Sequence, residues 1–582
     1  MATRTISDAG GNWNATGTWV EGAVPTSADD VVATATSGNL TIITGATWRS
    51  AVAKSIDLTG YKAGSVVTHT AGYNLSVYGN VTLSAGQYVA AGDTAKITLS
   101  NTATLTTAGC LLGALTVNKS GGTVTLGDNL AFRVGTGCVL TLQAGTLDLN
   151  GKTLSGNSAT NRVWVRSSTV GTSGAITVSG GTFANADFMD IAFDNGGSDL
   201  DLSAITGLSG DCGGNSMSGG GTLTFTTSRV CNWKTAAGGN WSDVANWDTT
   251  DATDRVPLPQ DDVTFDCAFN SGATVLSDTA LLGADIDWSS ATWSGTAPTW
   301  RGATQVWLFG SLTCVSGLKR YSNGFKVHFA GRGSHTLLWA GFSGSTVYIE
   351  CGSYTLLDAI TVNYGLIING GTFVSAGYSV TTAYQLKCLG TGVFDFSGST
   401  VSLLYSGVYS GFQMASTVTI IAAGSVLMLG TLYDSLALLM GPHVYNDIVL
   451  TPHATRALTF SGNFSFANMS MASAGSLTVK FTGGSSVTMT GDTFLTGTDG
   501  APITVTSTDT RQFTLSKSSE GYVSSDWLII DYCTVDAATS WYAGANSIDG
   551  GHNGTPTWTF SEPPPDTAIA VISQYYRRLR SA

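Results

Sequence analysis

The sequence predicts an all-β protein with the fold of an elongated parallel β-helix, or β-solenoid. The chain of 582 residues contains 73 glycines and only 11% charged residues, whereas charged residues make up about 25% of an ordinary soluble domain. Short runs of alternating apolar and polar residues are separated by Gly, Asn and Asp, as in strands joined by turns. Glutamate, a strong helix former, occurs only four times. Helices are therefore not expected in the body of the chain.

The spacing of these runs indicates coils. The runs ALTV (114–117) and VLTL (139–142) begin 25 residues apart, and TVTL (123–126) and TLDL (146–149) begin 23 residues apart. Such an interval is typical of one coil of a solenoid. A string of β-sandwich modules is the alternative, but it would show turn signals every ~8–12 residues without a recurring coil.

A duplicated phrase divides the chain. GGNWNATGTW (10–19) and GGNWSDVANW (238–247) are each followed by Val-Pro and then by Asp-Asp-Val. The first coil of a solenoid exposes unpaired backbone and a hydrophobic cross-section, which must be covered. We therefore expect two solenoid segments, 1–230 and 231–560, each beginning with a tryptophan cap. The predicted cap residues are Trp13, Trp19, Trp241 and Trp247.

The last residues change in character. DWLIIDYCTVD (526–536) is followed by a Gly/Asn-rich run and by PTWTF (556–560), where we expect solenoid pairing to finish. Region 561–582 begins with a proline linker and continues as an amphipathic helix with a basic end. This helix either folds back on the solenoid or docks on a partner. Its candidate docking residues are Ile572, Tyr575, Tyr576, Arg577, Arg578 and Leu579.

Charge and composition exclude several classes of function. The net charge of −13 and the absence of a basic stripe argue against nucleic-acid binding. No apolar run approaches the ~18 residues of a membrane span, and MATRTISDAGG lacks the apolar core of a secretory signal. The nine cysteines are widely spaced and odd in number. We interpret them as core residues, and the sequence predicts neither a metal site nor a cofactor.

The opening phrase, rungs such as GTLDLNGKTLSG (145–156), and the ending DWLIIDYCTVD resemble β-helix proteins of tailed bacteriophages. They also resemble modules of secreted bacterial surface proteins, although this chain shows no secretory signal. The resemblance implies a virion appendage of the tail spike or tail fibre type, often trimeric and often glycan-binding. Its partners would be other virion proteins, sister subunits and a host-surface polysaccharide. Assembly in the host cytoplasm and display on the particle are expected.

Tryptophans supply the candidate glycan contacts, because the apolar faces of sugars stack on aromatic rings. One stretch carries four candidates, for which the alternative is packing in the core: Trp288, Trp293, Trp300 and Trp307. We predict no catalytic residues, since the sequence contains no recognisable nucleophile or metalloprotease motif. A depolymerase with two carboxylates across a groove, a decoration protein without ligand and a secreted adhesin remain the alternatives.

Overall fold

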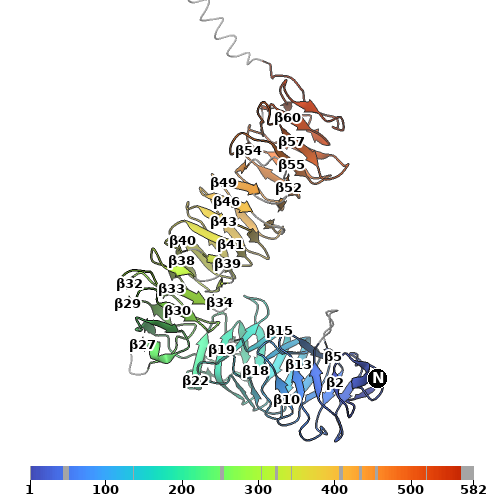
Figure 1. Ribbon diagram of the computed structural model, residues 1–582, viewed down its shortest axis with the longest axis vertical. Coiled ribbons are helices and arrows are strands. Elements are labelled where there is room, and N and C mark those ends of the chain that lie inside the picture. The colour runs from blue at the N-terminus through green and yellow to red at the C-terminus, as the bar shows by residue number, and fades with distance from the viewer. Residues whose placement is uncertain are drawn as a thin grey trace, which may run out of the picture. The chain divides into compact units, whose positions relative to one another are not determined.

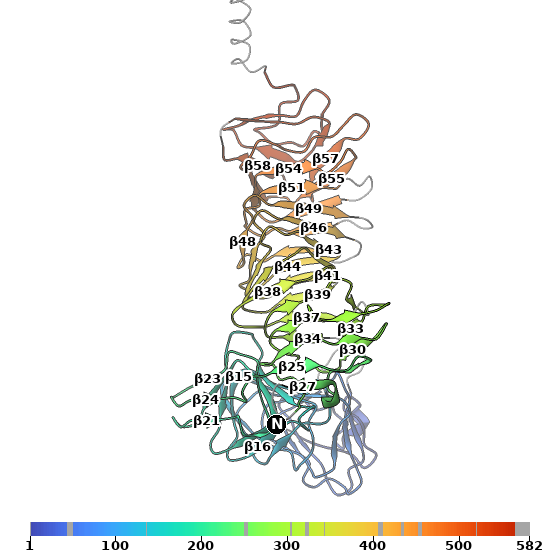
Figure 2. The same cartoon turned by 90° about the vertical axis from the view of Figure 1, so that its left-hand side faces the viewer.

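The predicted fold class is confirmed: the computed structural model is a nearly all-β, parallel β-solenoid of about 22 turns. Figures 1 and 2 show the strands stacked as successive coils. The structure describes residues 2–43, 51–135, 137–249, 254–302, 305–320, 325–342, 344–405, 411–431, 436–451, 457–519 and 521–564. Within these ranges the helices are two short 3-10 turns, η1 (Thr16–Thr18) and η2 (Val244–Asn246). The predicted C-terminal helix, with its docking residues, lies outside the described residues.

Contacts divide the chain into two compact units. Unit 1 comprises Met1–Ser311 and Phe329–Gly333, and unit 2 comprises Leu312–His328 and Ser334–Ala582. The units do not follow the segment boundary expected at residue 230. A strand at Val230–Trp233 lies at the expected start of the second segment, and the coils that follow it as far as Ser311 belong to unit 1.

The first segment consists of parallel ladders, one on each of three faces of the coil. The strands of the first face are β5 (Ala51–Ala53), β8 (Asn74–Val77), β11 (Lys96–Leu99), β13 (Ala114–Leu126), β15 (Val139–Asp148), β17 (Val163–Ser167), β19 (Thr182–Met189) and β22 (Thr206–Asp211). Those of the second face are β1 (Thr3–Thr5), β3 (Asp30–Val32), β6 (Ser55–Asp57), β9 (Val81–Thr82), β12 (Ala103–Thr106), β18 (Gly174–Thr177), β20 (Ile191–Asp194) and β23 (Ser216–Met217), together with the second halves of β13 and β15.

The third face of this segment has shorter strands. They are β2 (Gly11–Asn12), β4 (Leu40–Ile42), β7 (Val67–His69), β10 (Tyr88–Ala90), β14 (Leu130–Ala131), β16 (Thr153–Ser155), β21 (Leu200–Asp201) and β24 (Leu223–Thr224). Turns between the faces use glycine and asparagine, and Asn150 adopts a positive φ of 49°, a conformation that asparagine tolerates better than most residues.

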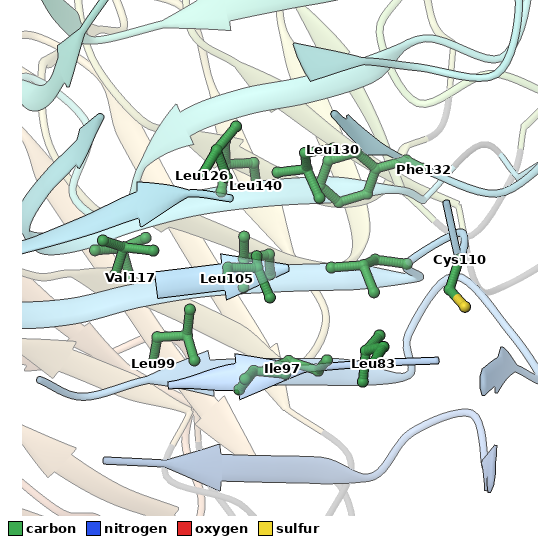
Figure 3. Close-up of a cluster of buried hydrophobic side chains, with 14 of the residues drawn as sticks. Leu83, Ile97, Leu99, Leu105, Cys110, Val117, Leu126, Leu130, Phe132 and Leu140 are labelled. Carbon is green, nitrogen blue, oxygen red and sulfur yellow. The ribbon is translucent and has the colours of Figure 1, made fainter. Parts of the chain in front are cut away.

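Alternation along each strand builds the core. Ile97 pairs with Leu115, which pairs with Leu140, so that inward-pointing aliphatic side chains stack from coil to coil. All three side chains are fully buried, and Figure 3 shows Ile97 and Leu140 within this interior column of apolar residues. Burial of one such side chain contributes roughly 1.5–3 kcal/mol. Because each coil adds a few of them, the interior stabilises the solenoid along its whole length.

The second segment starts inside unit 1. Its elements there are β25 (Val230–Trp233), β26 (Gly238–Asn240), β27 (Trp247–Thr249), β28 (Asp262–Thr264), β29 (Ala268–Phe269), β30 (Thr274–Ser277), β31 (Ile286–Asp287), β32 (Thr292–Trp293), β33 (Thr299–Gly302) and β34 (Gln305–Leu308). All of these strands pair in parallel except β25 with β27, which are antiparallel.

Unit 2 continues the same parallel pattern. One ladder contains β35 (Leu312–Thr313), β38 (Ser334–Leu338), β40 (Ser353–Leu356), β42 (Thr372–Val374), β45 (Val393–Asp395) and β48 (Thr419–Ile421). A longer sheet contains β39 (Gly344–Ile349), β41 (Ile360–Ile368), β43 (Val380–Thr382), β44 (Gln385–Cys388), β46 (Thr400–Tyr405), β47 (Phe412–Met414), β49 (Val426–Thr431), β50 (Leu436–Leu439), β51 (Asp447–Leu450), β52 (Ala457–Ser461), β54 (Asn468–Met471), β55 (Leu477–Phe481), β57 (Ile503–Ser507), β60 (Leu528–Ile530) and β63 (Ile548–Asp549). The remaining ladders pair β53 (Phe464–Phe466) with β56 (Ser486–Met489), β58 (Phe513–Lys517) and β61 (Cys533–Val535), and β59 (Tyr522–Ser524) with β62 (Ser540–Tyr542).

The cysteines occupy core positions. Cys267 is half-buried and the other eight are buried, all as free thiols. Burial raises the pKa of Cys388 and that of Cys533 to about 12. These thiols are therefore protonated at neutral pH and behave as small apolar side chains.

Candidate functional site

The two predicted caps have matching geometry. Trp19 Nε1 donates to the carbonyl of Trp13 at 2.9 Å, and Trp247 Nε1 donates to the carbonyl of Trp241 at 2.7 Å. The paired ring centroids lie 5.2 Å and 4.8 Å apart, with both pairs edge to face. All four indoles are buried. The repeated phrase is thus a repeated structure, with each tryptophan pair packed inside the first coil of its segment.

A carboxylate completes each cap. Asp29 accepts the N–H of Thr26 at 3.0 Å and lies 3.4 Å from Arg4 Nε. Asp261 accepts the N–H of Leu258 at 2.7 Å and pairs with Arg255 at 2.5 Å. Burial would raise the pKa of Asp29, but the hydrogen bonds to its carboxylate hold this pKa below its usual value. These carboxylates fix the chain where it enters the first strand, which is a structural role.

The structure corrects the predicted tryptophan surface. Trp288 and Trp300 are fully buried, and Trp300 Nε1 donates to Ser277 Oγ at 2.8 Å. The Trp288 ring stacks on Phe265 with centroids 3.6 Å apart. These two rings therefore form core and present no face to a glycan, because alternation turns them inward on their coils. Trp293 is half-buried, and Trp307 is nearly buried but borders a cavity.

This cavity has a volume of about 430 Å³ and lies within unit 1, where the first segment meets the beginning of the second. Its size lies within the usual range of small-ligand sites. Residues of the first segment on its wall include Asp93, Thr160, Arg162, Trp164 and Asp187. Those of the second segment include Pro257, Pro259, Leu281, Gln305 and Trp307.

Aromatic rings dominate one part of the cavity. The centroids of Trp164 and Trp307 lie 4.9 Å apart at an interplanar angle of 66°. The guanidinium of Arg166 stands 4.5 Å from the centroid of Trp164 and 5.4 Å from that of Trp307. Such a cation over an indole face stabilises the ring position by roughly 0.5–1 kcal/mol or more. Both rings are therefore held in place before any ligand arrives.

Polar groups surround these rings. Asp93 accepts the N–H of Gly137 at 3.0 Å. The hydroxyl of Thr160 and the amide of Gln305 also lie on the wall. Rings for the apolar face of a sugar and a carboxylate, hydroxyl and amide for its hydroxyl groups are the groups that carbohydrate sites use. The cavity can therefore hold a small polar ligand with one apolar face.

Two buried ion pairs support the same region. Arg162 pairs with Asp187 at 2.7 Å and also donates to three backbone carbonyls, those of Ala186, Gly207 and Leu208. Burial raises the pKa of Asp187, and the adjacent guanidinium offsets only part of that rise. Asp190 pairs with Arg332 at 2.5 Å. Asp187 and Asp190 thus anchor the coil ends.

Aromatic rings that the sequence analysis missed lie at or near the surface of unit 2, where tyrosines stack on neighbouring rings. Tyr364, which is 39% exposed, stacks with Tyr384 at a centroid distance of 5.1 Å. His328 stacks on Tyr348 at 4.2 Å and bonds Glu350 at 2.7 Å. Because the rings cover one another's faces, they offer mainly edges to a ligand. Only their position on outward-pointing sites of successive strands could have indicated them.

Within the described residues no cluster of three or more His, Cys, Asp or Glu side chains could hold a metal ion. A search of the same residues for a helix long and apolar enough to cross a membrane finds none. Comparisons with known protein families, with curated proteins and with solved structures find no match for the chain.

Proposed function

We propose that this protein is a structural protein of a bacteriophage virion, a surface appendage of the tail spike or tail fibre type that contacts glycans of the host surface. The β-solenoid fold is compatible with tail spike, depolymerase and adhesin roles. The resemblance of the opening, the rungs and the ending to phage β-helix proteins supports the virion role. A fold that consists almost entirely of stacked coils suits a rigid appendage.

The observation that carries glycan contact is the cavity of unit 1. Trp164 and Trp307 line it together, and Asp93 lies on the same wall. The rings are held by one another and by Arg166. A site whose aromatic groups are already fixed loses little side-chain freedom on binding, which favours measurable affinity for one or two sugar units.

Binding of the full-length protein to a panel of bacterial surface polysaccharides tests the proposal. We expect binding to at least one polysaccharide, and at least tenfold weaker binding by Trp307→Ala. Val244→Ala is the matched control, because Val244 is an exposed residue of the same segment and lies outside the cavity wall. Equal loss in both variants, or no binding to any polysaccharide, would contradict glycan contact. Immunogold labelling of particles tests the virion role separately, and labelling of the capsid alone would favour a decoration protein.

The proposed partners are other virion proteins and sister subunits, with a trimer as the assembly that the resemblance implies. The candidate docking residues 572–579 lie outside the described part of the chain, so this proposal rests on the sequence. Mass measurement of the purified protein tests the trimer directly. A secreted adhesin, in contrast, would be found on the surface of bacteria that carry no phage.

One observation favours a polysaccharide depolymerase as the second candidate. Asp93 and Asp187 both line the cavity, and burial raises the pKa of Asp187. Two carboxyl groups in different environments are the arrangement that glycoside hydrolysis uses. However, Asp187 is bound by Arg162, which is the geometry of an anchor and favours binding over cleavage. Release of reducing ends that is lost in Asp93→Asn would decide for the enzyme.

A further inference from the structure

The junction inside unit 1 is an end-to-end contact between two solenoid segments. Gln260, from the second cap, donates its amide N–H to the carbonyls of Ser209 and Thr226 at 3.0 Å and 2.8 Å. Its side-chain carbonyl accepts the N–H of Asp211 at 2.8 Å. A Cβ added at Gly210 would lie 2.7 Å from Pro259. One cap therefore closes the open edge of the preceding coil.

The coil that receives this cap occurs a second time, at the end of unit 2. In the first copy, Asp211 Oδ1 accepts the N–H of Gly213 at 2.8 Å and the amide of Asn215 at 2.7 Å. In the second copy, Asp549 Oδ1 accepts the N–H of Gly551 and the amide of Asn553, both at 2.8 Å. The loops DCGGN (211–215) and DGGHN (549–553) are thus the same structure.

The neighbouring contacts of these loops also match. Asn215 bonds the carbonyl of Phe188 and the N–H of Ile191, and Asn553 bonds the carbonyl of Ile530 and the N–H of Cys533. The strands TLTF (222–225) and TWTF (557–560) follow them. Leu202 N–H donates to Thr224, and Ala543 N–H donates to Thr559. Both segments therefore end in a terminal coil of the same structure.

Within the part of the chain that the structure describes, the second terminal coil has an edge without a strand partner. Gly550 N–H donates to Ile530 of the preceding coil, and alternate residues of a parallel strand bond to opposite sides. The N–H of Asp549 and the carbonyl of Ser547 consequently point outward, as those of Asp211 and Ser209 do where Gln260 binds them. Ile548 is 58% exposed beside these groups. An unpaired edge with an exposed apolar residue is a template for a further strand or cap.

The matching cap is open at the other end of the chain. Thr26, Ser27 and Ala28 occupy the positions of Leu258, Pro259 and Gln260, since each set lies between the Val-Pro step and the buried aspartate of its cap. Leu258 and Pro259 are buried in the junction, whereas residues 26–28 are all exposed. The chain thus carries a second cap and a second terminal coil of the same backbone design, with Ala28 in place of the hydrogen-bonding Gln260.

The two open halves are complementary in size. In the internal junction, the large side chains lie on the cap, as Pro259 and Gln260, and glycine lies on the coil at position 210. At the open ends the arrangement is reversed, with Ser27 and Ala28 on the cap and Ile548 on the coil. The summed side-chain volume at the open ends is therefore similar to that at the internal junction, and close packing requires such a match.

We infer that two copies of this chain associate head to tail. The N-terminal cap of one copy packs on the terminal coil at the C-terminal end of the next copy. The contact is heterologous, so it adds further copies in one direction and forms a filament unless it closes into a ring.

Sedimentation of the full-length protein over a range of concentrations, with electron microscopy of the products, tests this inference. We expect concentration-dependent end-to-end association. Both Ile548→Asp and Ala28→Lys should weaken it at least tenfold. Val444→Asp is the matched control, because Val444 is an exposed apolar residue of unit 2 with 62% exposure and lies away from both ends in the sequence. Circular dichroism shows whether each variant keeps its fold.

A mixture of the two end variants is the decisive experiment. In the mixture, the unchanged cap of the Ile548→Asp chain and the unchanged coil of the Ala28→Lys chain can form the wild-type contact, which happens only if the cap of one copy binds the coil of another. We therefore expect the mixture to form a heterodimer with restored affinity, while each variant alone stays weak. The inference is overturned if neither variant weakens association, if only Ile548→Asp weakens it, or if the mixture does not restore it. A protein that remains monomeric at all concentrations also overturns the inference.

Discussion

Trp164 and Trp307 meet edge to face, with ring centroids 4.9 Å apart, although Trp164 belongs to the first solenoid segment and Trp307 to the second. Both rings are 7% exposed. The contact therefore has two consequences, since it joins the two segments inside unit 1 and forms a wall of the cavity.

The first prediction concerns the energy of this contact. An edge-to-face aromatic pair contributes about 0.5–1.5 kcal/mol beyond the area that it buries. We expect Trp164→Ala and Trp307→Ala to destabilise unit 1, and the double variant to be less destabilised than the sum by about that coupling energy. Chemical denaturation of the four proteins measures it. Strictly additive losses would show that the rings do not stabilise one another.

The fold could be predicted from the sequence because a solenoid repeats its local chemistry. The alternation of runs such as ALTV (114–117) specifies which residues point inward, and the recurrence of the runs gives the coil length. The starting caps could be predicted for the same reason, since glycine and tryptophan repeat in a fixed phrase. The repeated ends were missed, because only the short Asp-x-Gly-x-Asn pattern of 211–215 and 549–553 and the Thr-x-Thr-Phe pattern of 222–225 and 557–560 connect them.

The candidate site could be predicted only in part. Trp307 was selected from the sequence, but its partner Trp164 was not, because a contact between distant coils leaves no spacing signal. Trp288 and Trp300 were selected and are buried. Where short strands alternate with turns, as in WSSATWSGTAPTW (288–300), the sequence pattern does not show which tryptophan side chains point inward.

The second prediction concerns the caps. Replacing either Trp13 or Trp241 by alanine leaves a large cavity in the first coil of a segment, and we expect a loss of about 3–5 kcal/mol in the free energy of unfolding. Trp241→Ala should cost more, since its ring also lies near Phe265. Thermal unfolding measures both variants against Val20→Ala, a truncation of an exposed residue in the first cap. Unchanged melting in either tryptophan variant would contradict the structural role.

The third prediction concerns acid stability. Burial lowers the pKa of His69 to about 4, from 6.5, and the neutral ring bonds Tyr88 Oη at 2.8 Å and the carbonyl of Tyr73 at 3.0 Å. Since the unfolded chain binds this proton at higher pH than the folded chain, stability falls as pH drops from about 6.5 to 4, by about 3 kcal/mol in total. It is constant above that window.

Denaturation of the wild-type protein and His69→Gln as a function of pH checks this expectation. Glutamine can form both hydrogen bonds and does not titrate, so the difference in stability between the two proteins should shrink or reverse as pH falls to 4. His552→Gln is the control, because His552 is an exposed histidine of unit 2. Parallel pH profiles of wild type and His69→Gln would show that His69 does not set the acid limit.

The fourth prediction concerns enzymatic activity. Arg162 holds Asp187 with a 2.7 Å ion pair and three backbone hydrogen bonds, so Asp187 is not placed to move a proton to a ligand. We expect no reducing ends and no unsaturated sugars when a bound polysaccharide is incubated with the protein. Chromatography of the polysaccharide after prolonged incubation is the measurement. Cleavage that disappears in Asp93→Asn would replace the binding proposal with the depolymerase.

The last prediction concerns residues 566–582, which follow Pro563–Pro565 in the sequence and lie outside the described part of the chain. Prolines restrict the linker and separate this segment from the last strands of the solenoid. Its apolar face is small, and an isolated helix of this length is marginal in water. Three arginines contrast with the net charge of −13. These properties favour order that comes from a partner.

Deletion of 566–582 should therefore leave the melting temperature of the solenoid unchanged and abolish either its incorporation into particles or its lateral assembly. Thermal unfolding and particle composition measure the two effects on the same variant. Replacing Arg577 and Arg578 by glutamine tests whether charge, rather than length, carries the docking. The head-to-tail contact involves Ile548 and Ala28 instead, so it should survive this deletion. A solenoid that unfolds without the segment would show that these residues stabilise the fold, because a docking element leaves the fold intact when it is removed.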